Sequence, residues 1–89
     1  MALSSKHRKT RDKIFEKPTT GTLEWRKIES LLLALGCEVQ KGPGSHIVFK
    51  HMKSGRKAHF HSPHPRPQTS KGAVECARDF IQIIEESVD

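Results

Sequence analysis

The chain has 89 residues, enough for one small domain, and its 16 Lys and Arg against 10 Asp and Glu give a net charge of +6. No apolar stretch approaches the roughly 20 residues of a membrane-spanning helix, and no apolar segment follows the N-terminal charges as in a secretory signal. These features predict a soluble, cytoplasmic protein that does not enter a membrane. The two cysteines, Cys37 and Cys76, are far apart and are expected to be reduced and buried.

Basic charge is concentrated before residue 70. Residues 1–17 hold six basic and two acidic side chains, residues 18–69 hold eight and three, and residues 70–89 hold two and five. A positive surface of this kind suits a polyanion such as a nucleic acid, although solubility alone also explains basic charge.

Residues 1–21 are predicted to form a basic extension and linker, and residues 22–89 a folded domain. Within the extension, residues 4–17 are polar except for Ile14 and Phe15, and form either a short helix held by these two or a disordered arm. Pro18 and Gly21 then indicate a linker.

Two amphipathic helices bound the domain. Thr22 is expected to cap the first, over residues 23–35, and Gly36 to follow its last turn. Its apolar residues recur at helical spacing: Trp25, Ile28, Leu31, Leu32 and Leu35. The second helix begins near Ser70 or Lys71 and ends near Ser87. Its apolar face is formed by Val74, Ala77, Ile81 and Ile84, flanked by Phe80.

Three strands are predicted between these helices. Residues 37–41 alternate apolar and polar, and residues 42–44 turn the chain. The segments SHIVFKH and RKAHFHS flank a four-residue hairpin loop at residues 52–55, and the proline-rich residues 63–69 form a crossing loop. The order α-β-β-β-α predicts a small α+β domain, with a three-stranded antiparallel sheet and both helices on one face.

Alternation along the hairpin determines the direction of its side chains. Ile47, Phe49 and Phe60 are expected to face the helices. The opposite, exposed face then carries His46, Lys50, Lys57, His59 and His61. The loop length pairs His46 with His61, Val48 with His59, and Lys50 with Lys57. By contrast, His51 and His7 are expected to be solvated surface residues.

Imidazoles beside lysines suit phosphodiester chemistry. Cleavage of RNA without a metal needs a base for the 2′-hydroxyl, an acid for the leaving 5′-oxygen and cations for the phosphate. His46 is the candidate catalyst, and His61 or His59 the candidate second proton-transfer group. The candidate RNA-binding residues are Lys41, Gly44, Ser45, Lys50, Lys57 and His59.

The alternative for the later histidines is a zinc site formed by His59, His61 and His64. It is disfavoured because structural zinc usually has four protein ligands, and no carboxylate or cysteine is near in sequence. No metal and no small-molecule cofactor are therefore expected. The Gly-Pro-Gly of residues 42–44 either cradles a phosphate or only turns the chain.

The segments LGCEVQK, GSHIVF, HFHSPHP and SKGAV, in this order, resemble the HicA family, the toxins of HicA–HicB type II toxin–antitoxin modules. The similarity covers roughly residues 22–86, and Gly-Ser-His-x-x-Phe is its most specific motif. It implies a fold like the double-stranded RNA-binding domain, metal-independent endoribonuclease activity on mRNA, and silencing by a HicB-type antitoxin. The family's catalytic histidine corresponds to His46. Pro43 and the first 20 residues depart from the family pattern.

Two other functions fit the same residues. One is a non-catalytic RNA-binding module that uses the same exposed face. The other is a protein-interaction domain whose basic face meets an acidic partner.

Overall fold

A computed structural model describes residues 4–61 and 68–86 of the chain. Its elements are α1 (Ser5–Ile14), α2 (Trp25–Ala34), β1 (Cys37–Lys41), β2 (His46–His51), β3 (Lys57–His61) and α3 (Lys71–Glu86). The strands form one antiparallel sheet in the order β1-β2-β3. The predicted small α+β fold is confirmed. Most of the predicted crossing loop, residues 63–67, lies outside the described residues.

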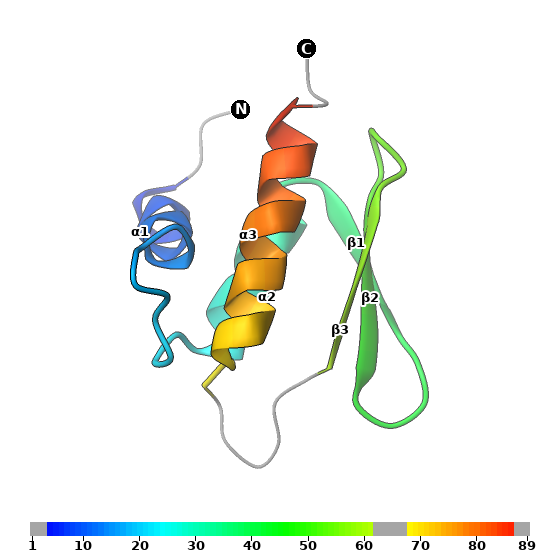
Figure 1. Cartoon of the computed structure of the whole chain (residues 1–89). Coiled ribbons are helices and arrows are strands. Elements are labelled where there is room, and N and C mark those ends of the chain that lie inside the picture. Colours follow the sequence, from blue (N-terminus) through cyan, green and yellow to red (C-terminus); the bar gives the residue numbers. More distant parts are fainter. Residues whose placement is uncertain (1–3, 62–67, 87–89) are drawn as a thin grey trace.

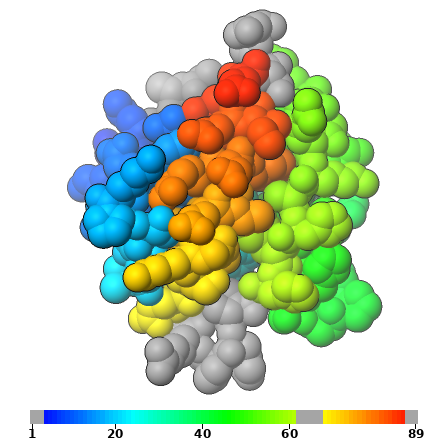
Figure 2. Space-filling view, viewed as in Figure 1, coloured from blue at the N-terminus to red at the C-terminus, as the bar shows by residue number. Residues whose placement is uncertain are grey.

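The helices form two layers beside the sheet. Figure 1 shows α2 and α3 on one face of the sheet, and α1 on the side of these helices away from the sheet. In the space-filling view of Figure 2, α3 crosses the molecule between α1 and the β2–β3 hairpin. Within the described residues, no helix is both long and apolar enough to cross a membrane. None of the helices in the described part of the chain covers the opposite face of the sheet (Figure 1).

The core fills the space between the sheet and the helices. Ile47, Phe49 and Phe60 are all buried, as the alternation of the hairpin predicts. The Trp25 ring of α2 lies 6.0 Å from that of Phe49 and 5.3 Å from that of Phe60, between ring centroids. These aromatic contacts join α2 to the two hairpin strands, and therefore fix which face of the sheet remains exposed.

The ends of α2 differ partly from the prediction. The helix begins at Trp25, and Glu24 occupies the N-cap position without a side-chain capping bond. The expected cap by Thr22 is wrong, because the Thr22 hydroxyl lies 2.9 Å from that of Thr20 instead. At the other end, Gly36 has φ +91°, the left-handed conformation expected after the last turn.

Residues 5–14 form α1, the helical alternative for the extension. Its Ile14 side chain is fully buried and belongs to the main hydrophobic cluster. Arg78 of α3 holds the end of α1: its Nε donates to the Ile14 carbonyl at 2.9 Å, and its Nη2 to Thr19 Oγ1 at 3.0 Å. Two hydrogen bonds from Arg11 to Glu85, of 2.8 and 2.6 Å, add a second tie to α3 and raise the pKa of Arg11. The basic extension is therefore packed against α3.

Of the two histidines expected at the solvated surface, the expectation for His51 is wrong. His51 is buried, with 3% of its surface exposed, and its Nδ1 lies 2.7 Å from Ser54 Oγ. The reason is its position two residues beyond Phe49, on the helix-facing side of β2, where it pairs with Cys37. His7 is only half-exposed. Its Nε2 lies 2.9 Å from Ser30 Oγ on α2.

The cysteines are both free, as predicted, but differ in burial. Cys37 is buried, and this burial raises the pKa of its thiol to about 11. The expectation that Cys76 is buried is wrong, since it is exposed on α3.

Candidate functional site

The exposed sheet face has the predicted register. His46 pairs with His61, Val48 with His59, and Lys50 with Lys57. Paired residues of an antiparallel sheet point to the same side, so all of these side chains lie opposite the buried Ile47, Phe49 and Phe60. We call the set His46, His59, His61, Lys50 and Lys57 the histidine face.

His46 contacts both other histidines of this face. Its Nε2 lies 3.2 Å from Nδ1 of His59, and the two rings stack with centroids 5.3 Å apart and planes 11° apart. The His61 ring lies 5.6 Å away, tilted by 40°, and its Nδ1 is 3.5 Å from Ser45 Oγ. A hydrogen bond between two imidazole nitrogens requires one ring to donate and the other to accept. In the His46–His59 pair one ring therefore donates its N–H and the other accepts it through a bare nitrogen.

The turn before His46 fixes the start of β2. The Gly42 N–H donates to the His46 carbonyl at 2.8 Å, and the His46 N–H donates to the Pro43 carbonyl at 3.3 Å. Pro43 therefore takes part in the turn through its carbonyl. Gly42 itself approaches the imidazole closely, since a Cβ at this position would lie 3.2 Å from His46 Nδ1.

Position 44 of the turn has a backbone conformation that only glycine adopts readily. Its φ is +64°, and a Cβ added there meets no atom within 4 Å, so backbone strain alone opposes a larger residue. Gly44→Ala is expected to lower the free energy of unfolding by about 1 to 2 kcal/mol, measured by urea denaturation. The control is Gly72→Ala on α3, which also has open space but no positive φ. It is expected to be neutral or slightly stabilising; an equal loss in both variants would contradict strain as the cause.

The two lysines of the histidine face, Lys50 and Lys57, lie side by side. Lys50 and Lys57 occupy directly paired positions, an arrangement that is unfavourable for like charges unless an anion is bound. Lys50 is also paired with Glu38 of β1, the other neighbour of β2 in the sheet. Within the described residues, however, no ion pair joins Lys50 or Lys57 to a carboxylate. Both ammonium groups are therefore available to an anion at this face.

Lys41 is not part of this group. The register pairs it with Ile47, whose side chain is buried on the helix side of the sheet. Lys41 is exposed at the end of β1, but it belongs to the opposite side of the sheet from Lys50. Gly44 and Ser45, the other candidates for RNA contact, are exposed in the turn next to His46.

No group of His, Cys, Asp or Glu side chains within the described residues has an arrangement that could hold a metal ion. The third histidine of the zinc alternative, His64, lies outside these residues. The sequence did not determine which of the two histidine rings forms a hydrogen bond with His46. The directly paired residue is His61, but the hydrogen bond goes to the diagonal neighbour His59.

Fold and site together define a small basic α+β domain that presents a cluster of histidines and lysines on an uncovered sheet face. The family model for the HicA toxin of bacterial toxin–antitoxin systems matches residues 25–78. The match spans more than half of the chain, which therefore belongs to the HicA toxin family and has an antitoxin partner by family membership. No curated protein and no solved structure matches the chain.

Proposed function

We propose that this HicA-family toxin is a metal-independent endoribonuclease that cleaves mRNA on the histidine face. The observation that carries the proposal is the 3.2 Å contact between His46 and His59, beside His61 and two lysines that make no ion pair within the described residues. Such a face supplies a base, an acid and cations from its own side chains. It does so on a surface that a long RNA strand can reach.

In this mechanism one imidazole accepts the proton of the ribose 2′-hydroxyl, and the 2′-oxygen attacks the adjacent phosphorus. The bond from phosphorus to the 5′-oxygen breaks, and a protonated second imidazole donates its proton to that leaving oxygen. The products are a 2′,3′-cyclic phosphate and a free 5′-hydroxyl. His46 takes one of the two roles, and the other falls to His59 or His61, whose rings lie 5.3 and 5.6 Å from that of His46.

Lys50 and Lys57 would hold a backbone phosphate of the bound strand, four residues along the hairpin from the His46–His61 pair. They precede and follow the hairpin turn on the same face as the histidines, so a strand crossing the face passes both. Gly44 and Ser45 would contact the backbone near His46. Lys41, on the other side of the sheet, is the weakest candidate of the set.

The antitoxin partner is proposed to be a HicB-type protein that covers His46. Steric masking of the histidine face would block RNA access directly. An acidic surface on that partner would also match Lys50 and Lys57.

The test is to incubate the purified protein with a long single-stranded RNA in EDTA. Cleavage is expected, and the new 5′ ends should accept phosphate from a polynucleotide kinase without prior dephosphorylation. The double variant Lys50→Gln/Lys57→Gln should bind RNA more weakly and lose about 0.7 log units of salt dependence per phosphate contact. The control Lys53→Gln removes an exposed lysine from the β2–β3 turn and should change little.

Each other outcome points to a different function. RNA binding without cleavage would favour a non-catalytic RNA-binding module. No RNA binding at low salt would leave a protein-interaction domain with an acidic partner. Cleavage that EDTA stops and zinc restores would contradict the metal-independent mechanism.

A further inference from the structure

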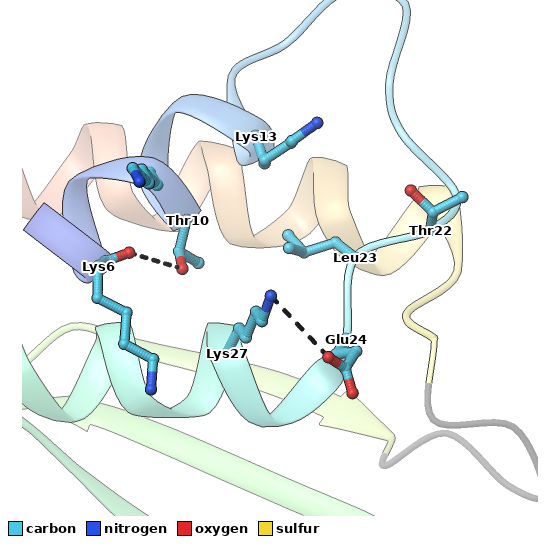
Figure 3. A pocket seen from close by; sticks show the side chains of 8 residues that line it. Lys6, Thr10, Lys13, Thr22, Leu23, Glu24 and Lys27 are labelled. Atoms are coloured by element: carbon cyan, nitrogen blue, oxygen red, sulfur yellow. Dashed lines mark hydrogen bonds and ion pairs between the residues drawn. The ribbon is translucent and has the colours of Figure 1, made fainter.

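A second basic site lies between α1 and the start of α2. A cleft of about 310 Å³ opens there, and its lining includes Lys6, Lys9 and Lys13 of α1 and Lys27 of α2. Figure 3 shows Lys6 and Lys27 extending between the two helices, with Thr22 and Leu23 on the segment that leads into α2. The cleft is separate from the histidine face, because α1 lies on the side of the helices away from the sheet (Figure 1).

The lining has an excess of positive charge. Glu24 is the one acid among the lining residues, against four lysines, a net charge of +3 for the lining itself. Lys13 also pairs with Glu16, which is not in the lining, at 3.8 Å. The Glu24 carboxylate is already shared, 3.9 Å from Lys27 Nζ and 3.4 Å from Arg26 Nε. Lys6 and Lys9 make no ion pair in the part of the chain that the structure describes. An anion bound here would relieve the repulsion between these ammonium groups.

The three lysines of α1 follow one helix face. Their spacing of three and four residues puts successive side chains about 5 Å apart along the axis, since each residue of a helix rises about 1.5 Å. Lys27 approaches from the facing helix. The site is therefore a short row of ammonium groups on α1 with Lys27 of α2 on the opposite wall, and not a single isolated ammonium group.

Hydroxyl and apolar groups complete the cleft. Thr10 and Thr22 bring hydroxyls, and the Thr10 hydroxyl is held in place by donating to the Lys6 carbonyl at 3.2 Å. Leu23, which is 6% exposed, supplies an apolar surface. Clefts of this size that combine an apolar wall with a few convergent polar groups are typical of small-ligand sites.

We propose that this cleft binds the phosphate groups of a nucleotide, either free or as part of an RNA strand. Phosphates carry several negative charges within a few ångströms, which matches a net charge of +3 in a small volume. An extended acidic peptide is less suitable. It advances about 3.3 Å per residue with side chains on alternate sides, and would bring fewer charges into the cleft. The proposal does not depend on nuclease activity at the histidine face.

The test uses the full chain and NMR spectra of its backbone amides. Sodium tripolyphosphate, the first probe, is expected to shift the amide signals of α1 and of residues 20–27. The variant Lys9→Gln/Lys27→Gln should bind it at least about tenfold more weakly, because a hydrogen bond to a charged group typically contributes this factor. The matched control, Lys53→Gln/Arg56→Gln in the exposed β2–β3 turn, removes the same charge and should bind it as the original chain does.

Two further probes identify the source of the phosphate. ATP represents a free nucleotide, and a 2′-O-methylated RNA of about ten nucleotides represents a strand that cannot be cleaved through its 2′-oxygen. Tighter binding of one of them at the same amides, with the same loss in Lys9→Gln/Lys27→Gln, assigns the source. The result is independent of the cleavage assay, so either proposal can fail alone.

Three results would overturn the assignment. The first is the absence of shifts around the cleft with all three phosphate probes. The second is equal weakening in the cleft variant and in the control, which would mean that only net charge matters. The third is a stronger response to an oligoglutamate peptide than to tripolyphosphate, which would indicate an acidic protein segment as the occupant.

Discussion

Replacing His46 with alanine is expected to lower the rate of RNA cleavage by a factor of about 100 to 10,000, the usual contribution of a positioned acid or base. The variant removes the ring that contacts both His59 and His61, while the backbone bonds of the turn at Pro43 and Gly42 remain possible. The measurement is the single-turnover rate on an end-labelled RNA in EDTA. His59→Ala should also slow cleavage, because it removes the partner of the shared proton.

The control for this series is His7→Ala. His7 is a histidine of α1 that contacts Ser30 on α2, away from the histidine face. It should cleave RNA at the original rate. If His46→Ala remained folded, by circular dichroism and urea denaturation, and cleaved as fast as the original chain, the catalytic role of His46 would be wrong. Growth arrest on expression, relieved by His46→Ala, is an independent check.

Phe49→Ala is expected to have the largest effect on stability. The Phe49 side chain is fully buried, and its ring contacts those of Trp25 and Phe60 at centroid distances of 6.0 and 5.7 Å. Removing a buried aromatic ring typically costs about 3 to 5 kcal/mol, comparable with the whole stability of many small domains. Urea denaturation should therefore show a chain that is largely unfolded in water, and Phe49→Leu a smaller loss that can be measured.

Val48→Ala is the matched control for this position. It lies on the same strand but on the exposed sheet face, and it is half-buried. Its loss of stability should stay below about 1.5 kcal/mol. Equal losses at residues 48 and 49 would contradict the assignment of the two faces of β2.

The faces of the hairpin are predictable because strand side chains alternate strictly. Ile47 and Phe49 need a helix-covered face, and this requirement alone places His46 on the other one. The four-residue loop then determines the pairing of His46 with His61. The same rule explains the wrong expectation for His51, which lies two residues from Phe49 and is therefore buried on the helix-facing side. It also places Lys41 of β1, two residues from the partly buried Val39, on that side of the sheet.

Other features depend on contacts that no local pattern contains. The choice of His59 as the hydrogen-bond partner of His46 depends on ring orientations across two strands. The docking of α1 depends on Arg78, which is 64 residues from the Ile14 carbonyl that it contacts. Residues 4–17 have only two bulky apolar side chains, so the sequence left both a short helix and a disordered arm open.

Ile14 belongs to the main core although it lies outside the segment that matches the family model. The segment that matches the family, residues 25–78, does not contain the whole hydrophobic cluster. Ile14 and Leu23 precede the segment, and Phe80, Ile81 and Ile84 follow it; all five are buried. The segment that matches the family model is thus shorter than the stretch of this chain that folds. A fragment cut to residues 25–78 would expose apolar surface on α2 and the sheet, and aggregation is the outcome to expect from it.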